Sequence, residues 1–154
     1  MDERPRVAFN GAGLIERAPS PILFRDRPLP AQILLGGVAP ALLGALAGVL
    51  LGVSAGAYWA VGAVAAVGGF LSGFEHRDGW GGADRGFFGG AFYGTALLVV
   101  HAIVGTHAKV GLGSFPPLLA VITAIVGMFI AAAGGRLARA GREARGEVPP
   151  PERY

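Results

Sequence analysis

The chain alternates long uncharged segments with short charged ones. The uncharged segments cover residues 28–74, 86–108 and 110–135, and all charged side chains lie before, between or after them. A helix rises 1.5 Å per residue and needs about 20 apolar residues to cross roughly 30 Å of hydrocarbon. The first segment is long enough for two crossings and a turn, and each of the others for one. The pattern predicts an all-α fold, a four-helix transmembrane bundle.

We place the four spans at about residues 31–53, 57–73, 87–105 and 116–135. The turn between the first two falls at residues 54–56, because Tyr58 and Trp59 follow it and such rings favour the headgroup level. Pro116 and Pro117 suit the first turn of the last span, where a missing N–H group matters little. Pro40, inside the first span, removes the backbone bond to the Gly36 carbonyl and predicts a bend there.

The segments outside the spans are polar. Residues 1–30 hold five prolines and mixed charges, which predicts a poorly ordered tail. Residues 75–85, "EHRDGWGGADR", are expected to form a solvated loop, and residues 106–115 a second connection. Residues 136–154 form a basic C-terminal extension, whose first part continues the last helix out of the bilayer.

The basic residues predict an orientation. Twelve of the 13 arginines and lysines lie in the two tails and the 75–85 segment, and Lys109 alone lies in the 106–115 connection. Four spans put the two tails and the 75–85 segment on the same side of the membrane. Cytoplasmic segments carry the excess of Lys and Arg. We therefore expect both termini to be cytoplasmic, in the cell membrane of a prokaryote.

Glycines recur every four residues in the spans. "GALAGVLLGVSAG" places Gly44, Gly48, Gly52 and Gly56 on one helix face, and weaker stripes of small residues occur in the second and fourth spans. The third span repeats the pattern, with Gly86, Gly90 and Gly94. Helices in lipid associate through close van der Waals contact, which small residues every four positions allow. The stripes predict helix packing, and the length of the first one suggests a second use, in a homo-oligomer or a larger membrane complex.

Composition narrows the classes of function. The chain has 154 residues, no Cys and only 15% charged residues, which excludes disulfides and thiol chemistry. Its basic residues flank the spans, so anionic lipid headgroups are the expected partner and nucleic acid is not. No acidic residue lies within a span, which argues against a proton-coupled carrier.

A few polar residues inside the spans are candidates for a site, chiefly Thr95, His101 and Thr123. An ionisable group within a membrane marks a functional candidate. The alternative is that His101 is a neutral imidazole bonded to a neighbouring helix. Because Thr95 and His101 are six residues apart, one helix cannot present both to the same path. His101 and His107 do not share a helix face as zinc ligands would, and the charged residues of the 75–85 segment match no calcium loop, so we expect no metal and no cofactor.

The segment from Gly68 to Gly94, "GGFLSGFEHRDGWGGADRGFFGGAFYG", resembles the central hairpin of small glycine-rich four-span proteins of unknown function found in haloarchaea and some other prokaryotes. This resemblance implies neither an activity nor site residues. The sequence favours a structural or accessory membrane protein that is not an enzyme. A small homo-oligomeric channel or holin-like pore, with a path lined by Ser72, Thr95, His101 and Thr123, is the alternative.

Overall fold

The computed structural model describes residues 23–147, and within them it is helical and contains no strand. Four helical segments are long and apolar enough to cross a membrane. The first, Leu29–Val53, comprises α1 (Leu29–Ile33), a π-helical turn (Leu34–Val38) and α2 (Ala39–Val53). The others are α3 (Ala55–Gly73), α4 (Gly79–Val104) and α5 (Leu118–Ala144). The chain is an all-helical, multi-pass membrane protein, as its pattern predicts.

The sequence places Pro116 and Pro117 in the first turn of the last helix, but α5 begins at Leu118, so both prolines precede it. Two other helix ends also differ from the sequence expectation. Ser54 alone separates α2 from α3, so the expected three-residue turn is wrong; its hydroxyl accepts the Ala57 N–H at 3.4 Å. α4 begins at Gly79 rather than near residue 87, because the Asp78 carboxylate accepts the Gly81 N–H at 2.8 Å and caps the helix. Residues 79–85 are therefore the first two turns of α4 and not a solvated loop.

The helix before Pro40 changes from α-helical to π-helical hydrogen bonding, in addition to losing the bond that the proline N–H would have made. The Ala39 N–H donates to the Leu34 carbonyl, five residues earlier. In that register the donor for the Leu35 carbonyl would be Pro40, which has no N–H. Pro40 thus leaves the Leu35 carbonyl without its helical donor, whereas the regular α-helical spacing assumed from the sequence assigns the lost bond to the Gly36 carbonyl.

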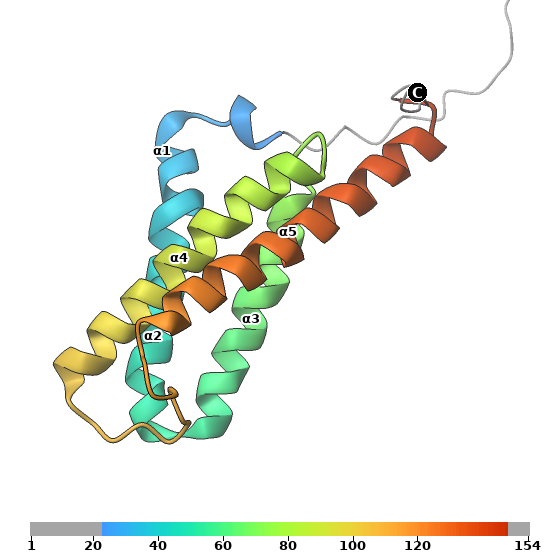
Figure 1. Cartoon of the computed structure of the whole chain (residues 1–154). Helices are drawn as coiled ribbons and strands as arrows, with labels where there is room; N and C mark the ends of the chain where they lie inside the picture. Colours follow the sequence, from blue (N-terminus) through green and yellow to red (C-terminus); the bar gives the residue numbers. More distant parts are fainter. Residues whose placement is uncertain (1–22, 148–154) are drawn as a thin grey trace, which may run out of the picture.

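α4 lies between α2 and α5 and packs closely on both (Figure 1). α3 leaves α2 at Ser54 and meets α5 near its other end, where Gly73 approaches the Ala131 carbonyl of α5. Ala47 and Leu51 of α2 form a fully buried cluster with Leu97 of α4, and Ala131 of α5 is also fully buried.

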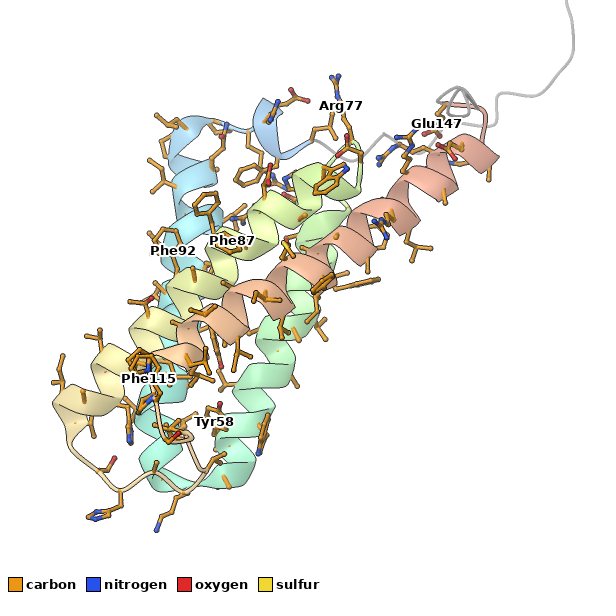
Figure 2. All side chains as sticks on the ribbon, in the orientation of Figure 1. Tyr58, Arg77, Phe87, Phe92, Phe115 and Glu147 are labelled. Carbon is orange, nitrogen blue, oxygen red and sulfur yellow. The ribbon has the colours of Figure 1, made fainter. Side chains whose placement is uncertain are left out.

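The two ends of the bundle differ in charge. At one end, which we call the basic end, Arg27 pairs with Glu75 at 2.7 Å and Arg142 donates to the His76 and Arg77 carbonyls at 2.9 and 2.7 Å. At the other end, which we call the Ser54 end, the Lys109 N–H donates to the Leu51 carbonyl at 2.8 Å. Figure 2 shows Arg77 at the basic end and Tyr58 towards the Ser54 end.

Candidate functional site

A cavity of about 710 Å³ opens among α2, α3, α4 and α5, and we call it the α3 groove. Most of its lining is apolar or glycine, and α3 contributes the largest share, between Tyr58 and Ser72. Small-molecule sites in proteins are typically clefts of about 300–1,000 Å³ with apolar walls and a few polar groups. The α3 groove has that size and that character.

The groove exists because α3 diverges from the packed unit of α2, α4 and α5. Trp59 and Leu71 line it and are 63% and 58% exposed, so it is open along the α3 edge. Glycines on α3 leave space in the groove. A methyl group at Gly62 would have only the Tyr93 hydroxyl nearby, at 3.9 Å. A methyl group at Gly68 would meet nothing within 4 Å.

Arg85 lies at the basic end of the groove. Its Nη2 donates to the Leu35 carbonyl, which Pro40 has left without a helical donor. The guanidinium also stacks on the Phe24 ring, 4.4 Å from the ring centroid. A methyl group at Gly36 would lie 3.0 Å from Nη1, so glycine there gives the guanidinium room beside the first span. The π-helical register before Pro40 thus supplies the carbonyl that holds Arg85 in place.

The charges at this end of the groove do not balance. Glu75, the acidic residue among those lining the groove, is bound to Arg27 in the 2.7 Å ion pair. Within residues 23–147, Arg85 forms no salt bridge, and its buried Nε atom has no hydrogen-bond partner. The three side chains together carry one net positive charge beside an apolar cavity.

His76 lies next to this cluster, in the turn between α3 and α4. Its ring stacks on Phe24 with centroids 5.7 Å apart, and Nδ1 lies 3.1 Å from the Ser72 carbonyl. Burial lowers the pKa of His76 below its ordinary value, against the smaller opposing effect of that carbonyl. Burial therefore favours the neutral imidazole, and Nδ1, which faces the carbonyl oxygen, is the nitrogen that donates.

The glycines singled out in the first span divide into two groups. Gly44 and Gly48 face α4: a methyl group at Gly44 would overlap the Tyr93 carbonyl, and one at Gly48 would lie 2.5 Å from the Leu97 carbonyl. Gly52 faces the Thr106 side chain. Gly56 makes no comparable approach, because only the Ser54 hydroxyl lies within 4 Å of the added carbon. Three of the four glycines of this stripe therefore make close contacts within the chain.

The glycines of α4 face α5. Methyl groups at Gly86 and Gly90 would overlap the carbonyls of Gly127 and Thr123, and one at Gly94 would overlap the Thr123 hydroxyl. The two helices thus approach to backbone contact along three successive turns of α4.

The polar candidates of the spans are not brought together. The ring of His101 bonds to α2, with Nδ1 3.3 Å from the Gly48 carbonyl, so this nitrogen donates. The Thr123 hydroxyl donates to the Ala120 carbonyl of its own helix at 3.0 Å. Thr95 is exposed on the surface of α4. Of the three, only Thr123 lines the α3 groove.

Sequence reasoning missed Arg85 as a site residue because it was assigned to a solvated loop. Two signals were available: Asp78 three residues before Gly81 fits a helix N-cap, and Pro40 leaves a carbonyl in the first span that needs a donor. The groove itself has no sequence signal, since it depends on the direction in which α3 leaves α2.

Comparison of the chain with known protein families, with curated proteins and with solved structures gives no match. No matching family thus accompanies the resemblance that residues 68–94 show to small four-span proteins. Within the part of the chain that the structure describes, no three His, Asp or Glu side chains gather as metal ligands would. The function must therefore be inferred from the geometry of the spans and of the α3 groove.

Proposed function

We propose that this multi-pass membrane protein is a structural or accessory component, without enzymatic turnover, that self-associates or joins a larger complex in a prokaryotic cell membrane. The observation that carries the proposal is the backbone contact of α4 with both α2 and α5, which makes these three helices a closely packed unit. A unit held by glycine contacts is suited to a fixed framework.

The polar side chains in the spans support the same proposal. Ser72 donates to the Gly69 carbonyl at 2.8 Å, and Thr123 and His101 are bonded to carbonyls in the same way. These bonds occupy the donors that a water-filled path would otherwise use. Three of the intramembrane polar side chains, Ser72, His101 and Thr123, thus bond the backbone of the chain itself.

A small homo-oligomeric channel or holin-like pore is the second candidate, and the placement of its required residues counts against it. Thr95 is on the outer surface of α4, His101 is turned towards α2, and Thr123 is bonded within α5. A pore would need these groups to share one path.

The two candidates differ in what they predict for His101→Leu. In the accessory role this change removes one interhelical bond, which costs about 0.6 kcal/mol in membrane proteins. We expect the variant to insert and fold, with a slightly lower melting temperature in detergent. Vesicles reconstituted with the unaltered protein or with His101→Leu should show no more ion or solute flux than empty vesicles. A flux that His101→Leu abolishes would overturn the accessory role and favour the pore.

Association is tested separately, by crosslinking in native membranes followed by mass spectrometry in mild detergent. We expect either a defined homo-oligomer or a reproducible membrane partner. The face of α3 away from the groove, which carries the exposed Val64 and Val67, is the expected contact, because no residue in the most apolar 18-residue window of α3 is buried in the chain. A monomer without partners at every concentration would contradict the proposal.

A further inference from the structure

We propose that the α3 groove binds a membrane lipid with an anionic headgroup, one acyl chain lying along α3 and the phosphate beside Arg85. This inference is independent of the proposed accessory role and rests on the groove and its charge. It assigns a ligand site to a chain in which the spans otherwise carry little polar chemistry.

The headgroup assignment follows from the charge at the basic end. Arg85 forms no salt bridge within residues 23–147, and Glu75 is occupied by Arg27. Glu75 attracts both Arg85 and Arg27, so the partly buried Arg85 guanidinium has no counter-charge of its own, which is costly. Anionic phosphate is a ligand that arginine binds in good geometry. One phosphate brings the net charge of Arg27, Glu75 and Arg85 to zero.

The acyl-chain assignment follows from the shape of the groove. Its α3 lining runs from Tyr58 to Ser72, which corresponds to about 21 Å of helix at 1.5 Å per residue. One leaflet is about 15 Å deep, half of the roughly 30 Å hydrocarbon core. The groove is thus long enough for a whole acyl chain that starts at the basic end.

The open edge of the groove explains how such a lipid enters. Trp59 and Leu71 line the groove and are more than half exposed, so a lipid can move in sideways from the bilayer while its second chain stays outside. A partner helix could also use this edge, but it would leave Arg85 unpaired unless it carried a carboxylate. Charge therefore favours the lipid.

The test uses the full chain, reconstituted with equal amounts of phosphatidylglycerol and phosphatidylcholine and then extracted in mild detergent. The lipid retained by the protein is measured by native mass spectrometry. We expect phosphatidylglycerol to be enriched about fivefold, the ratio that corresponds to about 1 kcal/mol for one cationic side chain at an anionic surface.

Two variants separate the headgroup from the chain. Arg85→Gln keeps a donor for the Leu35 carbonyl and should lose the enrichment while still retaining lipid. Gly62→Leu fills the groove where only the Tyr93 hydroxyl is near, and should reduce both retained lipids. The matched controls are Arg77→Gln, an exposed arginine in the turn before α4, and Ala60→Leu, exposed on α3 outside the groove lining.

The results distinguish an anionic lipid in the α3 groove from a helix of a second copy. Equal retention of both lipids by the unaltered protein, or enrichment unchanged in Arg85→Gln, would overturn the headgroup assignment. Retention unchanged in Gly62→Leu would overturn the groove as the binding place. If Gly62→Leu instead abolishes a crosslinked dimer and leaves lipid retention unchanged, the occupant is a helix of a second copy and the proposal is wrong.

Discussion

Gly89 and Gly90 are neighbours on α4, yet a methyl group at each would meet different surroundings. At Gly90 it would overlap the Thr123 carbonyl of α5, which is backbone and cannot turn away. At Gly89 it would lie 3.7 Å from Pro40 Cγ, an ordinary van der Waals distance. The requirement for glycine therefore changes from one residue to the next.

We expect Gly90→Ala to be less stable than Gly89→Ala. Alanine favours a helix over glycine by about 0.8–1.0 kcal/mol, so Gly89→Ala should be neutral or stabilising. Gly90→Ala gains the same propensity but forces α4 and α5 apart, which typically costs about 1–3 kcal/mol. Melting temperatures in one detergent measure the difference, and equal values for the two variants would contradict the backbone contact at Gly90.

The start of α4 shows what a single cap does for an element. Asp78 places its carboxylate 2.8 Å from the Gly81 N–H, and the helix then carries Arg85 to the groove. Without this cap the glycines at positions 79, 81 and 82 would favour an open loop, because glycine is a poor helix former. The position of Arg85 therefore depends on Asp78.

We expect Asp78→Ala to lower the free energy of unfolding by about 1 kcal/mol, the usual cost of losing an N-cap. Asp78→Ser should keep most of the stability, because a hydroxyl can also accept the bond. Asp84→Ala is the matched control, since Asp84 is exposed on the same helix and caps nothing. Denaturation in detergent measures all three, and a loss as large in the control would show a general effect of charge instead.

At the scale of the whole molecule, the folded chain gathers arginines from three separate segments of residues 23–147 at one end. Arg27, Arg85 and Arg142 all bind groups at the basic end, whereas Lys109 lies at the Ser54 end. Cytoplasmic segments of membrane proteins carry the excess of Lys and Arg. This rule is the basis of the orientation expected from the sequence, which stays a prediction.

Single introduced thiols test that orientation, because the chain has no native Cys. We expect Arg77→Cys to react with a membrane-impermeant reagent only after the cells are opened, and Lys109→Cys to react in intact cells. Both side chains are exposed, so access to the reagent depends only on the side of the membrane. The reverse pattern would place both ends of the chain outside.

The sequence by itself determined the number of spans and their approximate places. Uncharged segments long enough to cross hydrocarbon leave few alternatives, because a backbone in lipid must bond to itself and a helix does this locally. The same reasoning predicted a bond between His101 and a neighbouring helix as one of two interpretations, and that bond is present to Gly48. Local periodicity and solvation were sufficient for these features.

Only the tertiary structure decided which partner each glycine faces and where the cavity lies. The stripe at Gly44, Gly48 and Gly52 could have served a second copy, but it faces α4 and Thr106 within the chain. The α3 groove and the unpaired charge of Arg85 depend on the angle of α3 and on the register at Pro40. Contacts between helices far apart in sequence set both, and spacing along one helix carries no information about them.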